Sequence, residues 1–110
     1  MEILEAMLAG LQEGTDATGV VSGAIICGMR NIEPEKTTQL AQLAVDYRDR
    51  GVVGFDLAGA EADYPAKHHV EAFYTILNNN VNCTCHAGEG YWPESIQQAL
   101  HYCGAHRIGH

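Results

Sequence analysis

The feature that most constrains the fold of this sequence is a regular alternation of amphipathic and apolar segments. Four stretches carry apolar residues at the i, i+3, i+4, i+7 spacing of an amphipathic helix: Leu4/Met7/Leu8/Leu11, Leu40/Leu43/Ala44/Tyr47, Val70/Phe73/Tyr74/Leu77 and Ile96/Ala99/Leu100/Cys103. Short apolar runs follow them at 20–27, at 52–57, at 81–85 and at Ile108 with its neighbours. These runs are continuous, which is typical of strands covered on both faces. Because strand starts recur at about thirty residues, the size of one βαβ unit, we expect a parallel α/β sheet, either open or closed into a barrel.

Proline and glycine mark the ends of the expected helices. Proline at a helix start loses no hydrogen bond, because the first N–H groups have no partner there. Glycine, and to a lesser extent asparagine, ends helices because it adopts the left-handed conformation. Prolines lie at or just before the last three helix starts, and a glycine or an asparagine run follows each of the four helices: Pro34, Pro65 and Pro93, then Gly14, Gly51, Asn78-Asn79-Asn80 and Gly104.

The charge balance of the chain excludes two classes of partner. The formal net charge is −8, and six lysines and arginines spread along 110 residues do not make a basic face for nucleic acid or anionic membranes. No apolar run approaches the roughly 18 residues of a membrane span. Acidic residues stand near the start, where a secretion signal carries basic ones. We therefore expect a soluble cytoplasmic protein, and a small neutral or weakly cationic ligand is compatible with its charge.

The cysteines do not form a recognisable zinc motif. Cys27, Cys83, Cys85 and Cys103 lack the CxxC…CxxC spacing. We interpret them as reduced thiols, mostly small core residues. A metal pair formed by Cys83 and Cys85 is the alternative.

Residues capable of catalysis follow the expected strands. Arg30 follows the first run, Asp56 and Gly59 the second, His86 and Glu89 the third, and His110 the fourth. In a barrel, the carboxyl ends of parallel strands form the edge where catalytic groups converge. A histidine and a carboxylate three residues apart suit a metal ligand beside a proton-transfer group, as metal-assisted hydrolysis requires. No GxGxxG or GxxxxGK(S/T) follows a strand, so dinucleotide and phosphate-loop sites lack support.

Three short motifs lie at these strand ends. Residues 56–61 read DLAGAE, residues 86–89 read HAGE and residues 107–110 read RIGH. In this order and spacing they resemble the DLAGDE, HAGE and RxGH motifs of the zinc-dependent adenosine deaminases of the amidohydrolase superfamily. Segments 11–14 and 25–30 are similar to the preceding part of the same enzymes. The resemblance therefore covers nearly the whole chain, and the three motifs together are far more specific than HAGE alone.

This resemblance implies a fold, a cofactor and four residue roles. The fold is a (β/α)₈ TIM barrel with these segments as strands four to seven, and a complete site holds one Zn²⁺. His86 matches a zinc ligand, and Glu89 matches the group that protonates purine N1. Gly59 matches the residue whose backbone N–H bonds the purine ring, and His110 matches a histidine that orients the zinc-bound hydroxide without ligating zinc. The implied reaction is hydroxide attack at C6 of adenosine, a purine nucleoside, and loss of ammonia to give inosine.

The sequence departs from the family pattern in two ways. Ala60 stands where the family usually has aspartate, and we expect altered hydrogen bonding in that loop without loss of chemistry. The family's His-x-His zinc pair does not occur, since His68 and His69 are adjacent, and its paired aspartates would lie beyond His110. Residues 1–110 are therefore expected to form a single segment of a barrel domain, truncated at both ends, with one of four protein zinc ligands.

Two other functions stay open. One is a related aminohydrolase acting on adenine or AMP, because the residues that recognise ribose or phosphate lie mainly outside this segment. The other is a non-catalytic half barrel whose open sheet edges lead to self-association. Because catalytic zinc normally has three protein ligands, we predict no measurable deaminase activity and little zinc retention for the isolated 110-residue chain.

Structural roles compete with catalytic ones at the strand ends. The alternative for His86 is a buried histidine bonded to the backbone, and for Glu89 a solvated or helix-capping acid. Strand alternation places His86 and Thr84 on the barrel side, with Cys83 and Cys85 toward the helices. The two cysteines are thus not expected to share a metal with His86.

The remaining polar and aromatic residues receive structural interpretations. We expect Asp56 to bond the loop backbone and Arg30 to join a loop salt bridge, with a substrate contact as the alternative for Arg30. Tyr91 and Trp92 are expected either to wall the pocket or to pack against the following helix. Four histidines are interpreted as solvated or helix-capping: His68, His69, His101 and His106.

Overall fold

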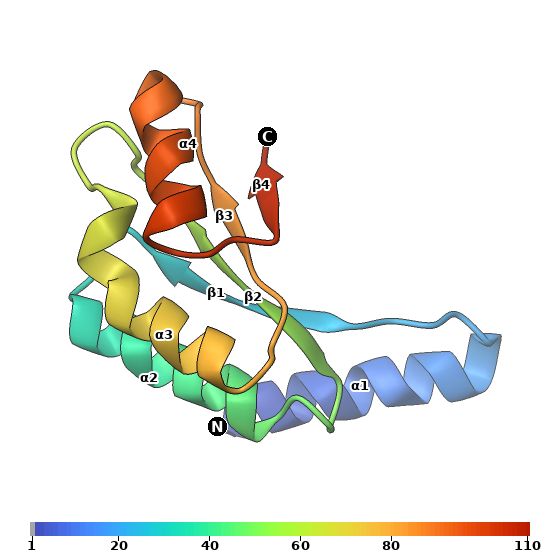
Figure 1. Ribbon diagram of the computed structural model, residues 1–110. Coiled ribbons are helices and arrows are strands. Elements are labelled where there is room, and N and C mark those ends of the chain that lie inside the picture. The colour runs from blue at the N-terminus through green and yellow to red at the C-terminus, as the bar shows by residue number, and fades with distance from the viewer. Residues whose placement is uncertain (1) are drawn as a thin grey trace.

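A computed structural model describes residues 2–110. Helices and strands alternate in the expected order, with one additional 3₁₀ turn, η1 (Figure 1). In chain order the elements are α1 (Glu2–Thr18), β1 (Ala24–Met29), α2 (Pro34–Asp46), β2 (Val52–Ala58), η1 (Ala66–His69), α3 (Val70–Asn78), β3 (Thr84–His86), α4 (Trp92–His101) and β4 (Arg107–Gly109). Among these described residues, no helix combines the length and the apolar character needed to cross a membrane.

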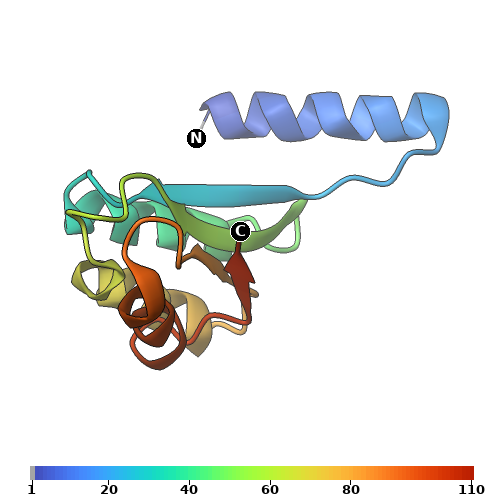
Figure 2. The same ribbon diagram turned by 90° about the horizontal axis from the view of Figure 1, so that it is seen from above.

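The strands run parallel and follow one another in space in chain order. β1 pairs with β2, and β3 pairs with β4. One parallel bridge between Phe55 and Cys83 joins the two pairs. Helices α2, α3 and α4 lie on one side of the strands, whereas α1 lies apart from these helices, near β1 (Figure 2). The expected parallel α/β arrangement is therefore confirmed.

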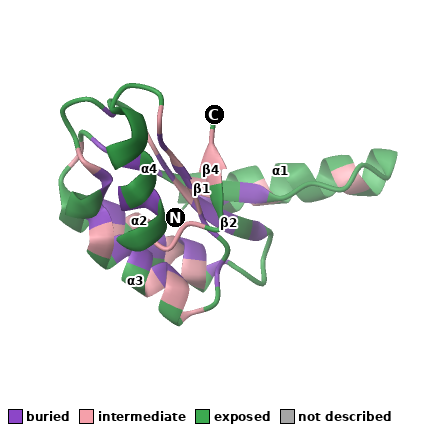
Figure 3. Ribbon diagram, turned by 45° about the horizontal axis from the view of Figure 1, so that its top comes forward, coloured by how far each residue is buried: buried purple, intermediate pink, exposed green. Residues whose placement is uncertain are grey.

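The core lies between the strands and helices α2, α3 and α4 (Figure 3). At its centre, the ring of Phe55 in β2 meets the ring of Phe73 in α3 edge to face, with centroids 5.6 Å apart. Both side chains are completely buried, as are Leu57 and Ile76 from the same two elements. Because β2 and α3 supply these four largest fully buried side chains, their contact helps to fix the position of the loop that follows β2.

The opposite face of β1 is open within residues 2–110. Ile25, Cys27 and Met29 are exposed there, whereas Ala24 and Gly28 of the same strand are buried. The continuous apolar run predicts a strand covered on both faces. The described residues cover only one face of it.

Two expected strands begin later than their apolar runs. β1 starts at Ala24 instead of residue 20, because Val20 and Val21 lie exposed in the connection from α1. β3 starts at Thr84, since before it only Cys83 makes a single bridge to the neighbouring strand. Apolar character alone therefore overestimates the length of both strands.

The first helix does not end at Gly14 as expected. α1 continues to Thr18, whose hydroxyl donates a hydrogen bond to the Gly14 carbonyl at 2.7 Å. Gly19, with φ +76°, takes the left-handed position that ends this helix. The other expected left-handed residues are confirmed, with φ of +111°, +57° and +60°: Gly51, Asn80 and Gly104.

His69 is buried, so its interpretation as a solvated residue was wrong; it occupies the N-cap position of α3, but its side chain makes no capping hydrogen bond. Its Nδ1 lies 2.9 Å from the Thr37 hydroxyl and its Nε2 lies 3.0 Å from the Arg30 carbonyl oxygen. Since a carbonyl only accepts, Nε2 carries the proton and Nδ1 accepts from Thr37. The neutral imidazole thus ties η1 to α2 and to the turn after β1.

Acidification is expected to destabilise the fold through His69. Burial, the largest cause, and the nearby Arg30 charge hold the pKa of His69 below its usual range, against the opposing hydrogen bond to the Arg30 carbonyl. The unfolded chain therefore takes up this proton first, and the free energy of unfolding falls as pH drops below about 6.5. Urea titrations across this range should show that His69→Gln flattens the decline. The exposed-site control His101→Gln should leave the decline unchanged, and an equal decline in all three proteins would contradict this assignment.

Candidate active site

Three side chains meet at the carboxyl ends of β3 and β4, two from the end of β3 and its following loop and one from the residue after β4. The ligand atoms of His86, Glu89 and His110 all lie within 4.8 Å of one another. Glu89 Oε1 lies 3.6 Å from Nδ1 of His110, and the rings of His86 and His110 meet edge to face with centroids 4.8 Å apart. We call these three residues the strand-end cluster. Two imidazoles and a carboxylate at such separations match the donors that zinc prefers.

Asp56 orients His86, one of the two histidines of this cluster. Its carboxylate lies 3.0 Å from Nδ1 of His86 and accepts a hydrogen bond from the Thr84 hydroxyl at 2.7 Å. Nδ1–H then faces the carboxylate, and Nε2 stays available as a metal ligand, an arrangement that zinc-binding histidines commonly show. The interpretation of Asp56 as bonded to the loop backbone was wrong. Parallel pairing with alternate side chains on one face places Asp56, Thr84 and His86 together.

Arg30 links the turn after β1 to the backbone next to the strand-end cluster. It is buried and donates hydrogen bonds to the carbonyl oxygens of Tyr64, at 3.0 Å, and of His86. The expected loop salt bridge was therefore wrong, because both acceptors are backbone carbonyls. Three elements that lie far apart in the sequence are joined at this one guanidinium.

Glu61 has a structural role that the sequence did not predict. The carboxylate is buried and accepts hydrogen bonds from the N–H groups of Gly88, Glu89 and Gly90 at 2.7, 2.8 and 2.9 Å. Burial alone would raise the pKa of Glu61, but the hydrogen bonds from these three N–H groups, together with the nearby Ser95 hydroxyl, outweigh burial and lower the pKa. In the sequence, Glu61 is only an acid in the loop after β2, and the glycines at 88 and 90 belong to a later loop. The fold is needed to show that this carboxylate and those backbone N–H groups meet.

Glycines shape the two loops of the site. Gly59 directly follows β2 with φ +103°, and a Cβ there would lie 3.1 Å from the Met29 side chain and 3.4 Å from the Arg30 amide. Gly88 has φ +83°, and a Cβ there would meet Ile96 at 3.0 Å. Positive φ and these close neighbours therefore favour glycine at both positions, where the loops pack against Met29, Arg30 and Ile96.

The aromatic pair after the HAGE motif does not form a buried wall in the described residues. Tyr91 is 42% exposed, and Trp92, which begins α4, is 75% exposed. Neither ring is buried against α4, so the packing alternative was wrong.

The cysteines lie on the side expected for them. Cys83 and Cys85 are buried toward the helices, whereas Thr84 and His86 contact Asp56 on the opposite face. Burial, the largest cause, raises the pKa of the Cys83 thiol. Because His86 points away from both sulfurs, a site shared by these residues is not formed.

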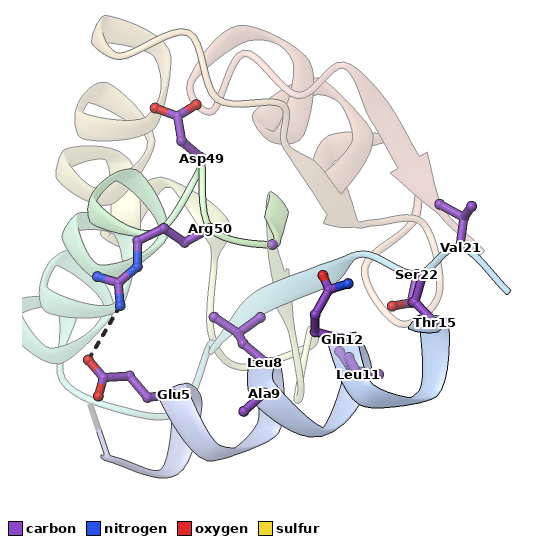
Figure 4. Close-up of a pocket in the computed structure, with 11 residues that line it drawn as sticks. Glu5, Leu8, Ala9, Leu11, Gln12, Thr15, Val21, Ser22, Asp49 and Arg50 are labelled. Carbon is purple, nitrogen blue, oxygen red and sulfur yellow. Dashed lines mark ion pairs between the residues drawn. The ribbon is translucent and has the colours of Figure 1, made fainter. Parts of the chain in front are cut away.

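Two cavities lie near the strands but outside the strand-end cluster. One of about 560 Å³ lies between α1 and the turn at 49–51, where Leu8 packs beside the ion pair of Glu5 and Arg50 at 3.7 Å (Figure 4). Another of about 450 Å³ is lined by strand residues that include Thr84. Neither cavity is lined by a member of the cluster.

Comparison with known sequences places this chain in a family. Residues 1–110 match the family model described as adenosine deaminase. A probable adenosine deaminase from Dictyostelium discoideum is 40% identical over 109 residues, which are 99% of this chain and 14% of that protein. The adenosine deaminase of Mycobacteroides abscessus is 42% identical over 114 residues, covering 99% of this chain and 31% of that protein.

Solved structures show the same fold. An amidohydrolase from Burkholderia ambifaria with bound Zn superposes with a TM-score of 0.89 at 20% identity, over 97% of this chain and 30% of that chain. Adenine deaminase from Arthrobacter aurescens gives 0.79 at 20% identity, over 91% and 30% of the two chains. The N6-mAMP deaminase of Arabidopsis gives 0.72 at 32% identity, over 80% and 26%.

The fold is therefore a partial (β/α)₈ barrel of the amidohydrolase type, as the resemblance implied. Within that class, this chain belongs to the adenosine deaminase family. It spans 14% of the length of the Dictyostelium relative and 31% of the mycobacterial one.

Proposed function

We propose that this protein catalyses the zinc-dependent hydrolytic deamination of adenosine to inosine and ammonia. Residues 1–110 form one segment of its barrel domain and carry part of the active site. The observation that carries this proposal is the strand-end cluster, in which His86, Glu89 and His110 meet within 4.8 Å in a chain of this family. Placement at the carboxyl ends of parallel strands agrees with it, because barrel enzymes build their active sites at that edge.

Each residue of the cluster has a distinct task in this proposal. His86 would hold zinc through Nε2, since Asp56 occupies Nδ1. When bound, zinc lowers the pKa of a water so that it can attack at neutral pH. Glu89 gives a proton to purine N1, which draws electrons from C6. His110 orients the attacking water, and the backbone N–H of Gly59 binds the purine ring.

The Asp56–His86 contact leads to a prediction about metal affinity. Asp56→Asn keeps the side-chain shape but removes the charge that fixes the imidazole, so zinc affinity should fall about 10- to 100-fold. Competition with a chromophoric chelator measures this change. The exposed-loop control Asp63→Asn should bind zinc as the unaltered protein does. Equal zinc affinity in both variants would contradict the orienting role of Asp56.

A second candidate substrate class is supported by the solved relatives. One neighbour is named an adenine deaminase and another an N6-mAMP deaminase. All of these substrates share the adenine ring that Gly59 and Glu89 are proposed to contact. Adenosine, adenine, AMP and N6-methyl-AMP should therefore be compared as substrates of one preparation.

The test of the proposed function is a deaminase assay with zinc supplied, on protein expressed with any sequence that flanks these residues in its gene. We expect adenosine to be converted to inosine faster than the other purines react. Preference for AMP or adenine would select the second candidate, and failure with all four substrates would contradict both.

The isolated 110-residue chain provides a matched comparison. It carries a single ligand of the family's expected zinc set, so we expect no measurable turnover and little zinc retention from it. Its open strand edges and the exposed face of β1 favour self-association, which light scattering would detect. Robust turnover by a monomer of this length would contradict the half-barrel account.

A further inference from the structure

The carboxylate of Glu61 connects the two loops that carry the proposed substrate contacts. Glu61 lies in the loop after β2, two residues beyond Gly59. Its Oε1 accepts from the Gly88 N–H, and its Oε2 accepts from those of Glu89 and Gly90. The loop after β3 is therefore bound to the loop after β2 through three consecutive backbone donors.

This connection is tight because the loops also touch through their backbones. A Cβ placed on Gly90 would lie 3.7 Å from both the Ala62 amide nitrogen and Glu61 Cβ. Glu61 itself is 7% exposed, so water competes poorly for its oxygens. Consecutive N–H groups that converge on one anion form a rigid concave site. Here the anion is part of the protein.

We propose that Glu61 is a positioning residue that holds Glu89 and Gly59 at a fixed separation across the purine site. The Glu61 carboxylate binds the backbone N–H groups of Gly88, Glu89 and Gly90 and not the side chains of the strand-end cluster, so it acts through Glu89 and not on the substrate itself. The inference rests on the proposed function, because Glu89 is its proton donor. In a site where a misplacement of about 1 Å costs on the order of 100-fold in rate, such a tether determines the rate of proton transfer.

The experiment replaces the acceptor without changing side-chain size. Glu61→Gln presents an NH₂ group where one carboxylate oxygen accepted, so at least one of the three N–H groups loses its partner. We expect amide exchange at residues 88–90, followed by NMR, to accelerate about tenfold or more while core amides stay unchanged. In the enzyme assay, kcat should fall about 10- to 100-fold with zinc content unchanged.

Two further variants make the test specific. Glu71→Gln, at an exposed position in α3, is the matched control and should change neither measurement. Glu61→Asp keeps the charge on a shorter side chain and should restore part of both the exchange protection and kcat. It also serves as the test variant if Glu61→Gln does not fold.

The outcomes separate this inference from the proposed function. Unchanged exchange at residues 88–90 in Glu61→Gln overturns the tether, and faster exchange with unaltered kcat overturns its positioning role. If the unaltered protein deaminates no purine while exchange still accelerates in the variant, the proposed function fails and the tether stands.

Discussion

Replacing Glu89 by glutamine is expected to lower the kcat for adenosine by about 10²- to 10⁴-fold, the range that a general acid contributes. The amide has the shape of the carboxyl group but cannot deliver a proton to purine N1. Zinc content should stay at the unaltered level, because in this account His86 and not Glu89 holds the metal. Metal analysis and steady-state kinetics on the same preparation measure both quantities.

The control for this variant is Glu94→Gln, which removes an exposed carboxylate in the first turn of α4. Its kcat should stay within about a factor of two, since surface substitutions rarely disturb a distant site. Loss of zinc from Glu89→Gln would make Glu89 a ligand instead of a proton donor. Full activity in the variant would remove Glu89 from the chemistry altogether.

Truncating Phe73 to alanine is expected to lower the free energy of unfolding by about 3–5 kcal/mol, the usual loss for a buried phenylalanine. Phe73 is completely buried and meets the ring of Phe55 edge to face at 5.6 Å. Removing it leaves a cavity between α3 and β2, beneath the strand that carries Asp56. Since native proteins are stable by only about 5–15 kcal/mol, such a variant approaches unfolding.

Urea denaturation followed by circular dichroism measures this loss as a shift of the midpoint. The neighbouring Tyr74 is 52% exposed, so Tyr74→Ala should change stability by only about 0.5 kcal/mol. Equal midpoints for the two variants would mean that the α3–β2 contact is not the centre of the core.

Local sequence pattern was enough to predict the elements. The spacing of Val70, Phe73 and Leu77 puts their apolar side chains on one face of a helix, and the structure forms α3 there. The meeting of His86 and His110 was also predictable, because the carboxyl ends of parallel strands lie at the same edge of a sheet. The first residues of β1 and β3 could not be predicted, since strand pairing depends on the neighbouring strand and not on apolar character alone.

The supporting contacts could not be predicted, because each one joins residues about thirty positions apart. Asp56 reaches His86, Glu61 reaches Gly88, and His69 reaches Thr37 only after the strands and helices have packed. Nothing in the local sequence distinguishes these polar side chains from solvated ones. Burial decides their roles, and burial follows from the tertiary fold.

The most direct measurement is an anomalous-scattering map at the zinc edge from crystals of the zinc-loaded protein, expressed with any sequence that flanks these residues in its gene. The account predicts a peak about 2.0–2.1 Å from Nε2 of His86, with the Asp56 carboxylate still on Nδ1. The Glu89 carboxylate should face the open side of the site. A zinc peak on Cys83 and Cys85, or one without His86 as a ligand, would contradict the account.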